Sequence, residues 1–157
     1  MKLYIKQHIF TWGDKFSIYD EAGVEQFYVE GEVFTFGKKL HLTDKRGVEL
    51  SYIHQELSLF RPRYLIRRGG RDIAEVVREF TFFKPEYTVD GLGWHVEGDF
   101  FSHEYTVSRG DSVIASVSKE WFTLGDAYAI DIAPGVDSIN VLSVVLVIDA
   151  VLASQDN

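Results

Sequence analysis

The sequence predicts an all-β barrel of about 12 antiparallel strands that encloses one C-terminal apolar α-helix. Three observations support this fold. One long apolar segment near the C-terminus has no polar face, short strand-like segments fill the rest of the chain, and two stretches of those segments resemble each other. No linker-like or low-complexity segment divides the chain, so we expect a single domain over residues 1–157.

The apolar segment from Val136 to Ala153 is predicted to be the helix. Pro134 and Gly135 interrupt what precedes it, and Asp137 or Ser138 offers an oxygen that can cap the first free N–H groups. The run is too long for an ordinary strand, although its β-branched residues are mildly poor helix formers. A helix that is apolar on all sides must be enclosed by protein or lipid. This run is shorter than the roughly 20 residues of a membrane span and contains polar residues, so we expect enclosure by the protein's own strands.

Alternating apolar and polar residues, separated by Gly- and Asp-containing turns, predict the strands. In chain order they are 2–10, 16–20, 24–30, a strand containing Leu40 and Leu42, 48–55, 63–67, 73–80, 87–89, 94–96, 105–107, 113–117 and 128–132. A barrel of about 12 strands is wider than the eight-stranded kind that side chains alone can fill, and it has room for a helix about 10 Å across.

An internal repeat suggests that the barrel consists of two similar halves. The matching segments are 29–34 with 96–101, 55–57 with 119–121, and 64–66 with 128–130. The offset between the copies falls by three residues along the chain. We attribute this shortfall to a shorter hairpin turn at 109–111 than at 43–47.

Composition excludes several classes of function. The net charge is −8, with 24 acidic and 16 basic residues, which argues against broad nucleic-acid binding. Cysteine is absent, so there is no disulfide framework, thiolate nucleophile or cysteine metal site. The N-terminal residues lack the apolar core of a signal peptide. We therefore expect a cytoplasmic protein.

Segments 96–100, 117–122 and 125–128, together with the terminal apolar helix and its Asp149, resemble the LURP-one-related proteins. The fold of that family is similar to the C-terminal domain of tubby proteins. The resemblance covers essentially the whole chain and implies a 12-stranded barrel around a C-terminal helix. It implies no established catalytic residue. Tubby domains and phospholipid scramblases, which look like distant relatives, point to phosphoinositide or phospholipid surfaces. This chain departs from the tubby pattern because it is short and acidic. No lipid contact is therefore carried over to a named residue.

A basic cluster is the candidate ligand site. Strand alternation places Arg61, Arg63 and Arg67 on one face, where guanidinium groups could hold the phosphates of an anionic headgroup. Lys38 and Lys39 form a second, smaller candidate. The alternative is a solvated strand face that acidic residues on the returning strand neutralise in part. Those residues are Asp72, Glu75 and Glu79.

No catalytic site, metal site or cofactor is predicted. His95 and Glu97 share a strand face, but two ligands are an incomplete set, and surface or packing roles are the simpler interpretation. The carboxylates Glu30, Glu32, Glu97 and Asp99 recur in both repeat copies, which favours a shared structural turn over an acid–base pair.

Asp149 interrupts the apolar run near the C-terminus of the helix, where the helix dipole disfavours a negative charge. A buried carboxylate needs a cation or several donors. We expect it to anchor the helix to an arginine or to backbone groups of the barrel wall, or to be exposed near the barrel mouth.

These observations favour a non-enzymatic binding module that recognises an anionic phospholipid headgroup or a protein partner on the outer barrel surface, peripherally at the membrane in the first case. Two alternatives remain open at this stage. One is a carrier of an apolar ligand in the barrel lumen, and the other is an enzyme with an unrecognised site.

Overall fold

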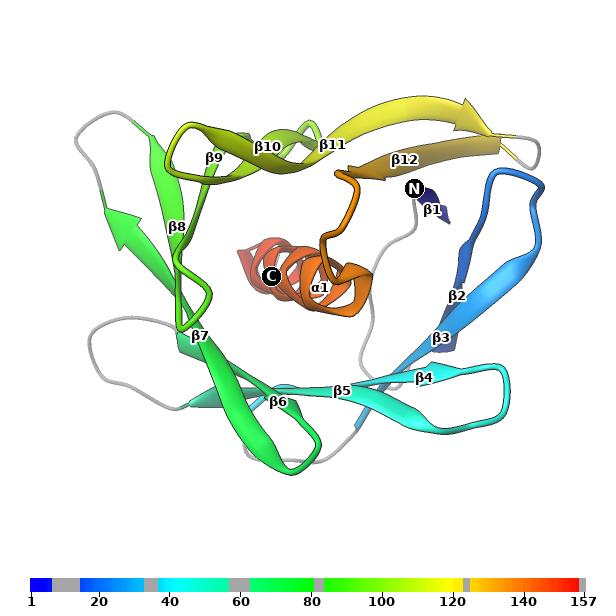
Figure 1. The fold of residues 1–157 in the computed structure, drawn as a ribbon, viewed down its shortest axis with the longest axis horizontal. Helices are drawn as coiled ribbons and strands as arrows, with labels where there is room; N and C mark the ends of the chain where they lie inside the picture. The colour runs from blue at the N-terminus through cyan, green and yellow to red at the C-terminus, as the bar shows by residue number, and fades with distance from the viewer. Residues whose placement is uncertain (7–14, 33–36, 57–62, 81–83, 123–124, 156–157) are drawn as a thin grey trace.

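A computed structural model describes the whole chain except residues 7–14, 33–36, 57–62, 81–83, 123–124 and 156–157. Within the described residues, twelve strands form one closed antiparallel barrel. Each strand pairs with its neighbours in sequence, and β1 pairs with β12 to close the ring. A single helix, α1 (Ser138–Gln155), runs through the middle of the barrel (Figure 1). The predicted barrel and its central helix are confirmed.

The strands occur where alternation and turn residues predict them, with somewhat different ends, and residues 7–10 of the first predicted strand lie outside the described residues. They are β1 (Lys2–Lys6), β2 (Lys15–Tyr19), β3 (Glu25–Gly31), β4 (Lys39–Asp44), β5 (Glu49–Glu56), β6 (Arg63–Arg68), β7 (Arg71–Phe80), β8 (Pro85–Asp90), β9 (Trp94–Asp99), β10 (Glu104–Arg109), β11 (Ser112–Phe122) and β12 (Gly125–Ile132). Pro85 begins β8 opposite Phe80, the last residue of β7. The first residue of a strand tolerates proline because its missing N–H is not needed in the ladder.

The helix begins at Ser138, two residues later than the apolar pattern predicts, because Asp137 caps it. One carboxylate oxygen of Asp137 accepts hydrogen bonds from the N–H groups of Ile139, at 2.9 Å, and Asn140, at 3.3 Å. These donors have no partner inside the helix, and an aspartate at this position is among the best acceptors for them.

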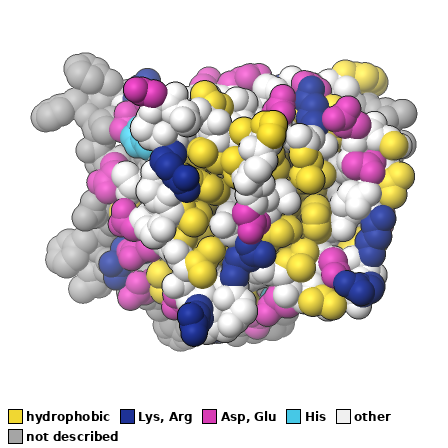
Figure 2. All heavy atoms as spheres, viewed as in Figure 1, with side chains coloured by type: hydrophobic (Ala, Val, Ile, Leu, Met, Phe, Trp, Pro, Cys, Tyr) yellow, Lys and Arg dark blue, Asp and Glu magenta, His cyan; other side chains and the backbone are white. Residues whose placement is uncertain are grey.

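The helix side chains and the inward side chains of the strands fill the barrel. Leu142, Val145 and Ile148 of α1 are fully buried, as are Ile53 of β5 and Ile66 of β6. Each such side chain contributes about 1.5–3 kcal/mol by leaving water. Figure 2 shows one face of the molecule, on which hydrophobic side chains gather toward the middle and charged ones are frequent around the margin. Among the described residues, no helix has both the length and the hydropathy that crossing a bilayer requires.

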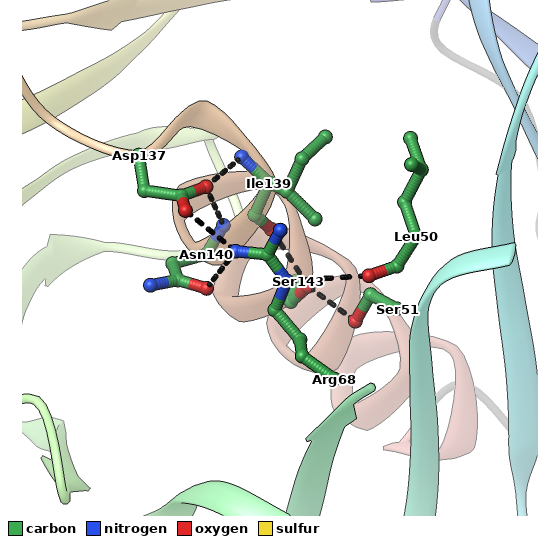
Figure 3. Close-up of polar contacts among 7 residues, drawn as sticks. All are labelled: Leu50, Ser51, Arg68, Asp137, Ile139, Asn140 and Ser143. Carbon is green, nitrogen blue, oxygen red and sulfur yellow. Dashed lines mark hydrogen bonds and ion pairs between the residues drawn. The ribbon is translucent and has the colours of Figure 1, made fainter. Parts of the chain in front are cut away.

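Arg68, at the end of β6, fixes the first turn of the helix to the barrel wall (Figure 3). Its guanidinium group donates to Asp137 at 2.6 Å, to the side-chain oxygen of Asn140 at 2.9 Å, and to the backbone carbonyl of Leu50 at 3.2 Å. One side chain thus joins β5, β6 and the helix N-terminus. A negative group at this end of a helix is also favoured by the helix dipole.

One turn further along the helix, a buried pair of hydroxyl groups makes a second connection. The hydroxyl of Ser143 lies 2.7 Å from that of Ser51 on β5 and donates to the carbonyl oxygen of Ile139, also at 2.7 Å (Figure 3). Both serines are buried. Asn140 and Ser143, two polar positions of the apolar helix, therefore have specific partners in the barrel wall.

The two repeat copies occupy corresponding strands, but the expected position of the shortfall is only partly correct. Glu30 on β3 and Glu97 on β9 are 67 residues apart, whereas their cross-strand partners, His41 and Thr106, are 65 apart. Two of the three missing residues therefore belong to the connection from β9 to β10, which is shorter than that from β3 to β4. The remaining residue belongs to the hairpin that the sequence indicated.

Candidate functional site

A row of polar side chains crosses the outer face of the barrel from β3 to β7. Glu30 pairs with His41 on β4, which pairs with Tyr52 on β5. Tyr52 pairs in turn with Arg67 on β6, and Arg67 pairs with Asp72 on β7. The residues before and after Glu30, His41 and Tyr52 are buried, so strand alternation turns these three side chains outward. Directly opposed side chains on neighbouring strands lie close enough to interact, which makes the row one continuous polar strip.

A hollow of about 350 Å³ opens along this strip, and we call it the outer hollow. Its charged and aromatic lining consists of Glu32, His41, Glu49, Tyr52 and Arg67, and the Gly69–Gly70 turn forms one edge. Because these residues come from the end of β3, from β4 to β6 and from the β6–β7 turn, the barrel wall itself fixes their relative positions.

His41 lies between the two carboxylates of the outer hollow. Its Nε2 is 2.9 Å from Glu32 Oε2, and its Nδ1 contacts Glu49 Oε1. Burial by itself would lower the pKa of His41, but the hydrogen bonds with Glu49 and Glu32 outweigh burial and raise this pKa above its ordinary value. The imidazolium therefore persists to higher pH than in a free histidine and holds both carboxylates at the rim.

Tyr52 supplies the aromatic wall of the outer hollow. The guanidinium carbon of Arg67 lies 5.7 Å from the centre of the Tyr52 ring, within the range of a cation–π contact. His54 stacks on the tyrosine, with ring centres 5.3 Å apart, and its Nε2 lies 3.4 Å from Asp72 Oδ1. Asp72 then accepts a 3.1 Å hydrogen bond from Arg67 Nε. The arrangement is a layered set of rings and charges that orders the Tyr52 side chain.

The second half of the barrel carries the equivalent row with different chemistry. There Glu97 pairs with Thr106, Thr106 with Ser116, and Ser116 with Asp131. The equivalent strands thus pair in the same register. Two small hydroxyl residues and a carboxylate take the positions that histidine, tyrosine and arginine occupy in the first half. The register of these strands therefore does not depend on the side chains found in the outer hollow.

The predicted arginine cluster is brought onto the outer face, and its described members are already paired. Arg63 contacts Glu56 and Glu75, each at 3.0 Å, in addition to the Arg67–Asp72 pair. The sequence indicated partial neutralisation by Asp72, Glu75 and Glu79. The structure has the contacts of Asp72 and Glu75, and Glu79 accepts a 3.5 Å hydrogen bond from Thr88. Arg61 lies outside the described residues.

The two lysines of the second candidate have different surroundings. The Lys38 amine donates a 3.0 Å hydrogen bond to the carbonyl oxygen of Ala150, in the last turns of α1. Burial lowers the pKa of this half-buried amine to about 8. Lys39 instead pairs across the strands with His54. The structure thus places Lys38 at the helix C-terminus, where a cation also complements the helix dipole.

Asp149 is anchored by a tyrosine, and the expectation of an arginine or backbone partner is wrong. Its Oδ2 accepts a hydrogen bond from the hydroxyl of Tyr128 on β12, while Oδ1 is buried and has no partner among the described residues. Burial raises the pKa of Asp149 to about 7, although the Tyr128 hydrogen bond acts in the opposite direction. His103 stacks on Tyr128, with ring centres 4.4 Å apart, and the hydroxyl of the neighbouring Tyr105 is also buried without a described partner. Tyr105 and Tyr128 belong to the core, and Asp149 and His103 are half-buried beside them, at the end of the barrel opposite the Asp137 cap.

A closed antiparallel barrel around a buried C-terminal helix defines the tubby-like class of folds. The comparisons agree with this class. A solved structure of a protein from Arabidopsis thaliana matches 96% of this chain and 90% of its own, with a TM-score of 0.71 and 21% identity, which establishes the shared fold.

The chain belongs to the LURP-one-related family, whose model matches residues 1–149. A Bacillus subtilis relative, the uncharacterised protein YxjI, is 38% identical over 157 residues, which cover all of this chain and 97% of the relative. The family resemblance of the sequence is thereby confirmed.

Proposed function

We propose that this protein is a non-enzymatic binding module, and that the outer hollow binds a basic side chain of a flexible segment of a partner protein. The observation that carries the proposal is the difference between the two halves of the barrel. The rows Glu30–His41–Tyr52–Arg67 and Glu97–Thr106–Ser116–Asp131 have the same register, and only the first combines aromatic rings with a bound histidine. Because the second half keeps the same register without this set, a binding role accounts for it better.

The chemistry of the outer hollow fits a cationic group. Glu32 and Glu49 keep 38% and 49% of their side-chain surface exposed, so their oxygens remain accessible beyond the His41 contacts. The Tyr52 ring lines the hollow and already makes one cation–π contact, with the Arg67 guanidinium at 5.7 Å, so an incoming lysine or arginine would bind beside Arg67 or in its place. The net charge of −8 would also speed the encounter with a basic partner.

An anionic phospholipid headgroup at Arg61, Arg63, Arg67, Lys38 and Lys39 is the other binding hypothesis from the sequence. In the structure, a phosphate would have to displace Glu56 and Glu75 from Arg63, and Asp72 from Arg67. Replacing carboxylates that are already in place gains less than filling an open guanidinium fork. The geometry therefore favours the protein partner. A carrier of an apolar ligand is not supported either, since the side chains of α1 occupy the lumen.

The proposal is tested by selecting peptides from a random display library on the full-length protein and measuring their Kd by fluorescence polarisation. We expect the selected peptides to be enriched in arginine and lysine. The variant Tyr52→Ser, which installs the residue of the second half, should weaken their binding at least tenfold. The matched control, Ser116→Ala in the second half, should leave Kd unchanged. Acidic peptides, or peptides that bind wild type and Tyr52→Ser equally, contradict the proposal.

A second arm addresses the headgroup hypothesis with phosphatidylcholine vesicles that contain or lack a phosphoinositide. We expect no flotation of the protein with either kind of vesicle. The contrary result is flotation that needs the phosphoinositide and is lost in the triple variant Arg61→Ala, Arg63→Ala, Arg67→Ala. It would show that the arginine cluster, and not the outer hollow, is the binding site.

A further inference from the structure

The outer face of β8 and β9 carries a second set of one histidine and two glutamates. Glu86 precedes Tyr87 on β8, and His95 and Glu97 flank Val96 on β9. Tyr87 and Val96 pair with each other and are buried, so alternation turns the glutamates and the histidine outward. The sequence indicated His95 and Glu97 on one strand face, and the fold adds Glu86 from the neighbouring strand.

These three side chains converge on one point. His95 Nε2 lies 3.5 Å from Glu86 Oε2 and 3.7 Å from Glu97 Oε2. One ligand atom from each residue lies within 4.8 Å of the other two. In tetrahedral zinc sites, bonds of about 2.0–2.1 Å place neighbouring ligand atoms about 3.4 Å apart. The two nitrogen–oxygen distances at His95 are therefore longer than good hydrogen bonds and close to the separation of neighbouring ligand atoms in a zinc site.

The contrast with His41 shows why this convergence matters. At His41, the two carboxylates contact opposite nitrogens of the ring, so they lie on opposite sides of the imidazole. A single ion cannot contact both. At His95, both carboxylates approach the same nitrogen, Nε2, which leaves the point between the three ligand atoms available. The two sets have the same composition, and only the second has the geometry of a metal site.

The arrangement of charge around His95 also favours a cation. Glu86 is directly opposite Glu79 on β7, and it lies on the same side of the Tyr87–Val96 pair as Glu97. Like charges on directly opposed positions of neighbouring strands destabilise a sheet. A divalent cation held by Glu86 and Glu97 would offset this repulsion.

We propose that Glu86, His95 and Glu97 form a binding site for a divalent transition-metal ion, for which Zn²⁺ is the appropriate probe. One imidazole and two carboxylates suit Zn²⁺, and three protein ligands leave a fourth position for water or for a side chain of a partner. Mg²⁺ demands octahedral geometry and loses its water reluctantly, so it should bind far more weakly. The site is on different strands from the outer hollow and does not depend on the function proposed for that hollow.

The experiment is isothermal titration of the full-length protein with Zn²⁺ and, separately, with Mg²⁺. We expect one saturable Zn²⁺ site per chain, and at least about a tenfold loss of affinity in Glu86→Gln and in Glu97→Gln. The matched control is the double variant Glu32→Gln, Glu49→Gln, which alters the other glutamate–histidine–glutamate set and should bind Zn²⁺ as wild type does. Circular dichroism and thermal unfolding without metal verify that each variant is folded.

NMR spectra of the histidine side chains locate the ion. Zn²⁺ should shift the ring resonances of His95 and leave those of His41 unchanged. The absence of saturable binding, equal affinity in wild type, Glu86→Gln and Glu97→Gln, or a shift confined to His41 would each overturn the proposal.

Discussion

The guanidinium group of Arg68 and the carboxylate of Asp137, 69 residues apart in the chain, form a 2.6 Å ion pair that joins the barrel wall to the first turn of the central helix. Asp137 is also the cap of that helix, so the contact links helix initiation to the position of the helix in the lumen. Arg68 additionally holds Asn140 and the carbonyl of Leu50. Arg68 is therefore part of the connection between barrel and helix.

Replacing Arg68 with methionine should lower the free energy of unfolding by about 1–2 kcal/mol, because three acceptors lose their donor while most of the apolar stem is retained. The measurement is equilibrium unfolding in urea. Arg46→Met is the matched control, since Arg46 is 85% exposed and lies 3.8 Å from Asp44. It should change stability little. Equal effects of the two substitutions would show that the Arg68 contacts do not fix the helix.

Ser51 and Ser143 should be energetically coupled. Ser143→Ala removes the buried partner of Ser51, and an unsatisfied buried hydroxyl costs about 1–3 kcal/mol. The double variant Ser51→Ala, Ser143→Ala removes both groups and should be less destabilised than the sum of the two single variants. Urea unfolding of all four proteins gives the coupling energy. Additive single effects would mean that this hydrogen bond contributes nothing to the folded state.

The sequence predicts the fold well because the fold depends on patterns that need no knowledge of the partner strands. Length and an apolar surface on all sides identify the helix, and period-two alternation identifies the strands. The sequence also offered Asp137 or Ser138 as the cap of this helix, and in the structure Asp137 is the cap, so the helix begins at Ser138 rather than at Val136.

The candidate site was largely beyond prediction because it depends on register between strands. Glu30, His41 and Tyr52 become neighbours only through the pairing of β3 with β4 and of β4 with β5. The β4–β5 ladder also shifts at a bulge between Leu42 and Thr43, which alternation alone does not locate. The same limit applies to Asp149, whose partner Tyr128 lies 21 residues earlier in the chain.

The contribution of Asp149 to the stability of the protein should decrease as pH rises from about 4 through about 7. The pKa of this carboxyl group rises from 3.8 to about 7 on folding, chiefly through burial. Between these values the folded state binds more protons than the unfolded state, so each increase in pH favours unfolding, by at most about 1.4 kcal/mol per pH unit.

Urea unfolding of wild type and Asp149→Asn between pH 4.5 and pH 8 isolates this contribution. Asparagine cannot ionise, so the stability of the variant relative to wild type should increase with pH over this range. Comparing the two proteins cancels His41, whose pKa is also raised on folding and whose stabilisation is likewise lost as pH rises. Parallel pH profiles for the two proteins would show that Asp149 does not ionise with an altered pKa.

Gly98 should not tolerate alanine, because the chain approaches it closely on one side. Its φ is 143°, and a Cβ at this position would lie 2.5 Å from the carbonyl oxygen of Glu104 and 2.6 Å from the Cα of Tyr105. Both obstacles are backbone atoms of β10, so no side-chain rotation relieves the clash. We expect Gly98→Ala to lower the free energy of unfolding by at least about 2 kcal/mol, through strain added to an unfavourable φ.

The matched control is Gly110→Ala, where φ is 56° and no atom lies within 4 Å of the added Cβ. There only the conformational cost applies, about 1 kcal/mol. Unfolding in urea distinguishes the two, and equal losses would mean that β10 moves away from Gly98 at no cost.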